Sequence, residues 1–419
     1  MQQQQSRELS NMVGENKNIP ELRFQGFSGA WEKRKLEDLG KIIRISIDPQ
    51  ATPGAKFNEY SMPAYDEGKK ANIVLGKTMQ SSRLKISGDV LLINKLNVRQ
   101  RRIWLLRNIS GNAVASSEFM PFVSNMLNLE FLEHMMLSDR TTLAMESISS
   151  GTSNSQKRIT PSDFLSYVIS VPADAHEQAK IGRMFTEIDN LIAVNQRKLN
   201  TLKKLKKSYL QKMFPQNGSE FPELRFAGFT TPWEKRKLGD LAGQTYGGGT
   251  PKTNVNRYWE GNIPWIQSSN LNNDDVQNIK INKFISDDAI QDSAVKLVPA
   301  DSIAIVTRVG VGKLALVHQS FATSQDFLSL SHLNTDTQFS LYAIYKMMKK
   351  EASQTQGTSI KGITKNVLTN KILLVPHNLA EQAKVGSFFK SLDNRITVNQ
   401  RKLDALKKLK QGYLQKMFC

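Results

Sequence analysis

Hydrophobic residues recur at alternating steps of four and three along two long segments of the chain. The first segment carries this pattern from Ile181 to Tyr209, and the second carries it from Val385 to Tyr413. Such a seam is typical of helices that pair as a coiled coil. We therefore expect two long helices, each spanning ~57 Å, that pair antiparallel with each other. Two independent amphipathic helices are the alternative.

The predicted seam also contains polar positions. Asn195 and Asn399 fall within it, where a polar pair fixes the register at some cost in stability. Lys206 takes a place that the pattern assigns to an apolar residue. The seam positions are Ile181, Phe185, Ile188, Ile192, Asn195, Leu199 and Leu202 in the first segment and Val385, Phe389, Leu392, Ile396, Asn399, Leu403 and Leu406 in the second.

A short polar motif marks the start of each predicted helix. Asp174 is followed three residues later by Glu177, and Asn378 is followed in the same way by Glu381. This spacing is typical of a capping box, in which the two side chains satisfy backbone N–H groups of the first turn.

The chain consists of two tandem copies of one pattern. EQAKIGRMF at 177–185 returns as EQAKVGSFF at 381–389, and ELRFQGFSGAWEKRKLEDL at 21–39 returns as ELRFAGFTTPWEKRKLGDL at 223–241. The repeats are shifted by 204 residues (from 177 to 381) and by 202 residues (from 21 to 223). Self-similarity of this kind indicates a duplicated structural unit.

Between the matching ends, residues 41–147 barely resemble residues 243–355. Each copy therefore has an opening segment and a closing segment that both copies share. Between them lies a region that differs between the copies, called here the private region (41–147 and 243–355). A pseudo-twofold axis across the paired helices would present the two private regions at opposite ends of one rod.

Short apolar runs predict that the private regions are mixed α+β. Asp89–Ile93, Ser302–Val306 and Ile372–Val375 read as strands, and Leu341–Lys350 reads as a helix. The expected parts are a tail at 1–20, mixed α/β domains at 21–172 and 217–376, and long helices at 173–216 and 377–419.

Charge indicates the class of partner. The chain has 57 Lys and Arg against 38 Asp and Glu, a formal net charge of +19, which favours a polyanion such as nucleic acid. A membrane is disfavoured, because no apolar run reaches the ~20 residues of a spanning helix. The polar start lacks a signal-peptide hydrophobic region, so we expect a cytoplasmic protein.

The sequence offers no catalytic or metal centre. Its single cysteine, Cys419, excludes a disulfide framework, and the five His show no metal-ligand spacing. ANIVLGKT at 71–78 fits a relaxed phosphate-loop pattern, but its NIVL interior reads as a strand. GVGKLA at 310–315 imitates a dinucleotide fingerprint, yet the residues around it predict a hairpin.

Several motifs together resemble the specificity subunit of type I restriction-modification systems. They are the opening motif ELRF..F...WE..KL.DL, the stretch GGGTPKTNVNRYWEGNIPWIQSSNLN at 247–272, the GTS...KGIT echo at 357–364, and the repeated EQAK closing segment. They cover nearly the whole chain in order and twice over. The first copy departs from the pattern, because it lacks the GGTP and IPW signatures.

The resemblance implies a function as well as a fold. It implies two target-recognition domains that each read one half of a split duplex-DNA site, and paired helices that act as a spacer and dock two adenine methyltransferase subunits. Restriction subunits would complete the nuclease. S-adenosylmethionine, ATP and Mg would then belong to the partner subunits, and this chain would be a non-catalytic recognition subunit without a cofactor.

DNA recognition needs basic and polar side chains on exposed loops, and most of their hydrogen bonds go to phosphates. The candidates are Arg99, Arg101, Arg102, Lys157, Arg158, Thr250, Lys252, Ser268, Arg308, Ser359 and Lys361. Two other classes stay open: an enzyme that acts on nucleic acid through an unrecognised site, and a bivalent RNA-binding scaffold.

Overall fold

The structure is a computed structural model that describes residues 18–109, 111–151, 156–216, 218–354 and 362–418. The chain folds into two compact units. The first unit combines residues 1–195 with residues 402–419, and the second unit is residues 196–401. Each unit thus includes a part of both closing segments.

The described residues of the first unit form three β-sheets. A ribbon pairs β1 (Glu32–Lys35) with β11 (Val168–Val171), antiparallel. A four-stranded sheet has the order β2 (Lys41–Ile42), β10 (Phe119–Val123), β7 (Gly88–Asn94), β8 (Ile103–Ile109). A five-stranded sheet has the order β3 (Ser46–Ile47), β6 (Arg83–Lys85), β9 (Ala113–Ser116), β4 (Lys56–Tyr60), β5 (Asn72–Leu75).

The second unit contains the same kinds of sheet. Its ribbon pairs β12 (Glu234–Lys237) with β20 (Ile372–Val375). Its four-stranded sheet has the order β13 (Ala242–Gly247), β19 (Phe327–Leu333), β16 (Ser302–Val306), β17 (Leu314–Val317). A smaller sheet has the order β15 (Phe284–Ile285), β14 (Ile263–Ile266), β18 (Ala322–Thr323).

Shorter helices complete both units. The first unit has α2 (Leu36–Leu39), α3 (Met62–Asp66), α4 (Leu129–Met136), α5 (Asp139–Ser147) and α6 (Pro161–Ser166). The second has α8 (Asp287–Gln291), α9 (Thr337–Gln354) and α10 (Lys365–Thr369). Single 3₁₀ turns lie at Pro49–Ala51, Gly76–Thr78, Val98–Gln100, Leu238–Leu241, Asn256–Trp259 and Ser268–Asn270.

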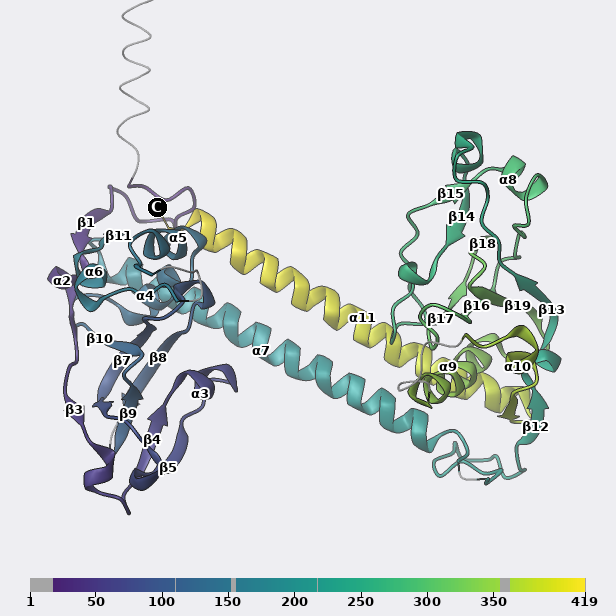
Figure 1. Cartoon of the computed structure of the whole chain (residues 1–419), viewed down its shortest axis with the longest axis horizontal. Helices are drawn as coiled ribbons and strands as arrows, with labels where there is room; N and C mark the ends of the chain where they lie inside the picture. Colours follow the sequence, from purple (N-terminus) through teal and green to yellow (C-terminus); the bar gives the residue numbers. More distant parts are fainter. Residues whose placement is uncertain (1–17, 110, 152–155, 217, 355–361, 419) are drawn as a thin grey trace, which may run out of the picture. The chain divides into compact units, whose positions relative to one another are not determined.

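The two private regions are two versions of one fold. Strands β2, β10, β7 and β8 occupy the same places in their sheet as β13, β19, β16 and β17 in theirs. The parallel pair of β4 with β9 matches the parallel pair of β14 with β18. In both units, the four-stranded sheet lies between the long helices and the other sheet (Figure 1). The predicted tandem α/β duplication is confirmed.

The long helices are α7 (Ala175–Lys212) and α11 (Leu379–Lys416), with 38 residues each. In the first unit, the start of α7 lies beside the end of α11. There the rings of Phe185 and Phe418 stack with their centroids 5.6 Å apart. In the second unit, the end of α7 lies beside the start of α11, where Tyr209 meets Phe388 at 5.0 Å. The helices thus run antiparallel in each unit, as predicted.

The apolar positions of the predicted seam are buried or half-buried. Ile181, Phe185, Leu199, Phe389 and Leu403 are at most 1% exposed. Ile188, Val385 and Leu392 are also buried, and Ile192, Leu202, Ile396 and Leu406 are half-buried.

The polar seam positions differ from the expectation. The buried Asn195 and Asn399 each donate the side-chain amide to a carbonyl of their own helix, those of Leu191 and Arg395, at 2.7 and 2.8 Å. Lys206, which interrupts the seam, is buried and forms an ion pair with Asp393 at 2.5 Å.

The predicted capping boxes are wrong in their second half. The carboxylate of Asp174 caps the helix by accepting from the N–H of His176 at 2.7 Å. The carboxylate of Glu177, however, accepts two hydrogen bonds from Arg23 at 2.6 and 2.7 Å and is only 1% exposed. A buried carboxylate gains more from a guanidinium than from one backbone N–H. The matching Glu381 binds Arg225 of the second opening segment.

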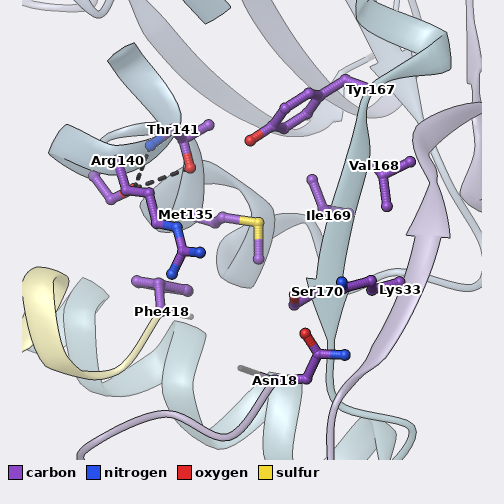
Figure 2. Close-up of a pocket in the computed structure, with 11 residues that line it drawn as sticks. Asn18, Lys33, Met135, Arg140, Thr141, Tyr167, Val168, Ile169, Ser170 and Phe418 are labelled. Carbon is purple, nitrogen blue, oxygen red and sulfur yellow. Dashed lines mark hydrogen bonds between the residues drawn. The ribbon is translucent and has the colours of Figure 1, made fainter. Parts of the chain in front are cut away.

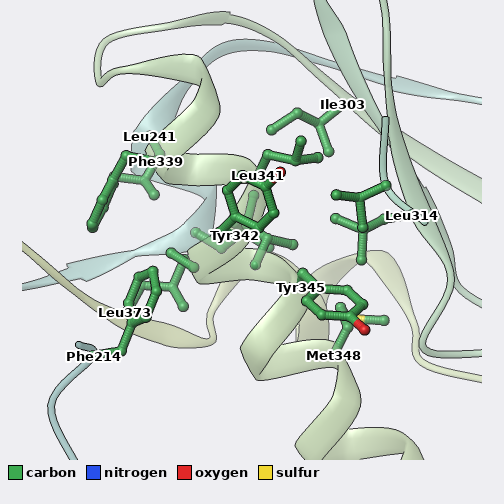
Figure 3. Close-up of a cluster of buried hydrophobic side chains, with 14 of the residues drawn as sticks. Phe214, Leu241, Ile303, Leu314, Phe339, Leu341, Tyr342, Tyr345, Met348 and Leu373 are labelled. Carbon is green, nitrogen blue, oxygen red and sulfur yellow. The ribbon is translucent and has the colours of Figure 1, made fainter. Parts of the chain in front are cut away.

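Glycines allow close contact between the closing segments and the private regions. A Cβ on Gly386 of α11 would lie 2.5 Å from the backbone N of Phe339, and one on Gly182 of α7 would lie 2.8 Å from that of Phe131. In the second unit, aromatic side chains of α9 pack against Phe214 and against residues of β16 and β17 (Figure 3).

Among the described residues, none of the helices has the length and apolar character that crossing a bilayer requires.

Candidate nucleic-acid interface

In the second unit, polar candidates gather where several strands end. Ser268 follows β14, Arg308 follows β16, and Gln325 follows β18. Three hydrogen bonds join these strand ends: Thr307 N–H to the Asp326 carbonyl at 2.7 Å, Ser324 N–H to the Ile266 carbonyl at 3.0 Å, and Lys313 Nζ to the Ser268 carbonyl at 3.1 Å. The strand ends therefore form one continuous edge.

The glycine-rich loop at 247–253 lies against this edge. A Cβ on Gly248 would collide with the Ser324 carbonyl, so the backbones approach as closely as glycine permits. Thr250 donates its hydroxyl to Gln325 Oε1 at 2.5 Å. The structure thus brings Thr250, Ser268 and Arg308 to the same edge of the second unit.

Two tryptophans hold the loop. Trp265 donates its indole N–H to the Gly249 carbonyl at 2.9 Å, and Trp259 donates to the Lys252 carbonyl at 3.2 Å. The two rings meet edge to face at 5.0 Å, and Lys283 lies over both. Since these bonds fix the loop through its carbonyls, the exposed side chain of Lys252 remains available to a ligand.

The KGIT echo returns to the same edge. Ile363 N–H donates to the Thr307 carbonyl at 2.7 Å, and a Cβ on Gly362 would lie 2.9 Å from Cγ of Arg308. The candidates Ser359 and Lys361, which precede this contact, lie outside the described residues.

The first unit has a matching edge at the turn between β7 and β8. Asn97 N–H donates to the Lys157 carbonyl at 2.9 Å, and Ile159 N–H donates to the Lys95 carbonyl at 3.0 Å. Arg158 forms isolated β-bridges with Leu96 and with Ser150. In both copies, the described residues that follow the GTS motif, 157–159 in the first and 362–363 in the second, thus contact the corresponding hairpin, which the sequence alone did not indicate.

The basic candidates of the first unit all form ion pairs with acidic residues of the same unit, which sequence analysis missed. Arg99 binds Glu146 at 2.6 Å, and Lys157 lies 3.8 Å from the same carboxylate. Arg158 binds Glu118 at 3.0 Å. Because Arg99 remains 56% exposed and Arg158 46% exposed, both can exchange these carboxylates for another anion.

Arg101 and Arg102 are tied more firmly to the fold. Arg101 binds Asp139 at 2.5 Å and donates to the Leu137 carbonyl at 3.0 Å. Arg102 donates to both carboxylate oxygens of Asp66 at 2.8 and 2.6 Å, and its side chain is 17% exposed. These bonds hold the pKa of Asp66 below its ordinary value. Arg102 thus joins α3 to the hairpin.

Three features of the interface were not predicted from the sequence: Gln325, Trp259 and Trp265. The signal for the tryptophans was present, because both follow the glycine-rich loop within sixteen residues of Gly249 (265 − 249 = 16). Within the described ranges, no group of three or more His, Cys, Asp or Glu could hold a metal ion.

Comparison with known proteins identifies similar sequences that all belong to one family. A family model described as the type I restriction modification DNA specificity domain matches residues 29–204 and again residues 230–408. The MjaIX specificity subunit of Methanocaldococcus jannaschii is 24% identical over 46% of this chain and 45% of its own length. The EcoR124I/EcoR124II specificity subunit of Escherichia coli is 32% identical over 39% of this chain and 42% of its own. These matches span about half the length of the curated relatives.

Solved structures show the same fold. The S subunit of a type I restriction-modification system from M. genitalium aligns with a TM-score of 0.64 at 14% identity, over 96% of this chain and 99% of that one. A chain from a structural study of the assembly and conformational transition of a type I restriction-modification system aligns with a TM-score of 0.52 at 19% identity, over 94% and 99%.

Proposed function

The chain belongs to the family of type I restriction-modification DNA specificity subunits, and on this premise we propose that each unit reads one half of a split duplex-DNA site. One observation carries the proposal. The same sheet order occurs twice, but the edges that correspond carry different residues, with Arg99 and Arg158 in one unit and Thr250 and Arg308 in the other. Two units that share a backbone fold but carry different side chains at the corresponding edge are suited to recognising different bases.

The closing segments are proposed to set the spacing of the half-sites and to dock two adenine methyltransferase subunits. Apolar side chains are exposed at equivalent places on α7 and α11: Val194 (51%) and Val398 (61%), and Leu205 (40%) and Leu409 (42%). Both pairs are related by the shift of 204 that relates the closing segments. Two equivalent apolar positions suit two copies of one partner protein.

Methyl transfer and cleavage are proposed to occur in the partner subunits, which would hold S-adenosylmethionine, ATP and Mg, on DNA in the cytoplasm. The purified chain should then not methylate DNA alone, and adenine methylation should appear only with a methyltransferase subunit. Turnover by the isolated chain would contradict this assignment.

A region exchange tests the two-reader proposal. Residues 41–147 are replaced by the matching region of another family member, the variant is expressed with its methyltransferase, and the methylated adenines are located by sequencing. One half of the motif should change and the other should not. A matched exchange of residues 243–355 should change the opposite half. If either exchange altered both halves, the proposal would be wrong.

A further inference from the structure

The first unit contains a pocket of about 290 Å³ beside its ribbon of β1 and β11. The ribbon, α4, α5 and the end of α11 form its walls (Figure 2). Its lining residues include Asn18, Lys33, Met135, Arg140, Tyr167 and Phe418. None of the hairpin residues proposed to read DNA lies in the wall.

The charged side chains in the wall of the pocket are all positive. Arg140 lines it from α5, and Lys33 lines it from β1 on the other side (Figure 2). Of the described residues in its wall, none carries a carboxylate. Asp139, the chain neighbour of Arg140, is bound by Arg101 at 2.5 Å. Two positive charges therefore face this space without an acid of the wall to balance them.

Neutral donors and an apolar surface complete the wall. The phenol of Tyr167 points from the ribbon toward α5 (Figure 2), and burial raises its pKa, so the hydroxyl keeps its proton at neutral pH. A protonated hydroxyl can donate to an anion. Met135 and Phe418, which are 3% and 5% exposed, supply an apolar side.

In the second unit, the residue that corresponds to Lys33 has an acidic partner. Lys235, the counterpart of Lys33 (shift of 202), binds Glu220 at 3.1 Å. Glu220 is in turn the counterpart of Asn18 (shift of 202), so the first copy has an amide where the second has the neutralising acid.

The second unit also differs from the first at the position of Tyr167. Lys371, the counterpart of Tyr167 (shift of 204), binds Glu351 of α9 at 2.8 Å. In the second unit each of these two cations thus has an acidic partner, whereas Lys33 of the first unit has an amide at the position of that acid. The difference between Asn18 and Glu220 therefore leaves the charge of Lys33 unbalanced within the wall.

We propose that this pocket binds a small oxyanion, a phosphate or carboxylate group, between Lys33 and Arg140. A volume of about 290 Å³ lies near the lower end of the usual range for small-molecule sites. The oxyanion would accept from the ammonium, the guanidinium and the Tyr167 hydroxyl, and an attached apolar group would contact Met135 and Phe418.

The experiment titrates the full chain by calorimetry with inorganic phosphate and, separately, with acetate, at constant ionic strength. Asn18→Glu places the acid of the second copy beside Lys33, and Lys33→Gln removes the cation. Each should weaken oxyanion binding at least tenfold. Lys235→Gln makes the same change of charge in the second unit and should alter the affinity less than twofold. Circular dichroism confirms that each variant is folded.

Each outcome decides the proposal. Saturable binding of phosphate or of acetate that both first-unit variants lose supports it, and the anion that binds identifies the chemistry. Absence of saturable binding of both anions to the wild type overturns it. Binding that survives both variants, or that falls equally with Lys235→Gln, also overturns it, because the anions would then be attracted by the general positive charge.

Discussion

The ion pair between Lys206 and Asp393 has an equivalent in the first unit, and the two pairs should differ strongly in their contribution to stability. Asp189 and Lys410 lie 2.6 Å apart and are the counterparts of Asp393 and Lys206 by the shift of 204. In the second unit, the two side chains are 6% and 4% exposed, whereas in the first unit Lys410 is 18% and Asp189 40% exposed.

Lys206→Met should therefore lower the stability of its unit far more than Lys410→Met lowers the stability of the first unit. Removing one partner of a buried pair leaves an uncompensated charge and costs about 3–5 kcal/mol, although the hydroxyl of Tyr342 still donates to Asp393 at 2.8 Å. An exposed pair contributes about 0–1 kcal/mol. Replacing both Lys206 and Asp393 by apolar residues of similar size should recover much of the loss, because no charge then remains buried.

Hydrogen exchange measures this difference within one unit, since a single unfolding free energy is poorly defined for a chain of two units. At roughly 1.4 kcal/mol per tenfold, a cost of about 3–5 kcal/mol means that peptides from α9 and from the start of α11 should exchange about 10²- to 4 × 10³-fold faster in Lys206→Met. Lys410→Met should accelerate peptides from α4 less than about fivefold. Equal acceleration by the two variants, or less than tenfold in Lys206→Met, would refute the reasoning.

The pH dependence adds a second check. Burial raises the pKa of Asp393 above 3.8, and Lys206 opposes that rise. A carboxyl with a raised folded pKa binds its proton more readily in the folded state, so its stabilising effect is present at low pH and is lost as pH rises through the folded pKa. Without Lys206 the folded pKa rises further. The loss of stability that Lys206→Met causes in the second unit should therefore be smaller at acidic pH and larger at neutral pH.

Three further predictions concern the proposed function. Arg308→Ala should weaken DNA binding and reduce the salt slope by about one if the contact is to a phosphate, and an unchanged affinity and slope would exclude that contact. Trp265→Phe removes the hydrogen bond to Gly249, so methylation should become less selective at the half-site of the second unit only, as sequencing would show. A seven-residue insertion after both Lys198 and Lys402 lengthens each helix by ~10 Å, so the unread spacer should grow by up to about three base pairs. An active variant whose methylated motif keeps its spacer would contradict the role of the helices.

The long helices were predictable because their periodicity persists over many turns, so local preference and tertiary pairing agree. The strand Ser302–Val306 was predictable for a similar reason, since four of its five residues are apolar, and all five are buried. The capping boxes failed because the partner of Glu177 is Arg23, which lies 154 residues away in the chain. Sequence spacing reports neighbours along one helix and does not reveal such distant competitors.

The candidate interface was predictable only in outline. Arg99 and Arg102 were expected to contact DNA, but they bind Glu146 and Asp66, which come from distant segments of the chain. The equivalence of the two private regions depends on which strands pair, and nonlocal pairing leaves little trace in diverged sequences. Ser359 and Lys361 stay predictions.

The way in which the first unit is assembled has a consequence for synthesis. Its core contains Phe185 from the start of α7 together with Met417 and Phe418 from the end of α11. The ribosome makes Phe418 233 residues after Phe185 (418 − 185), which takes roughly 10–50 s at about 5–20 residues per second. The second unit, whose residues are continuous in the chain, is complete sooner. The part of the protein that is translated first is therefore the part whose core is closed last.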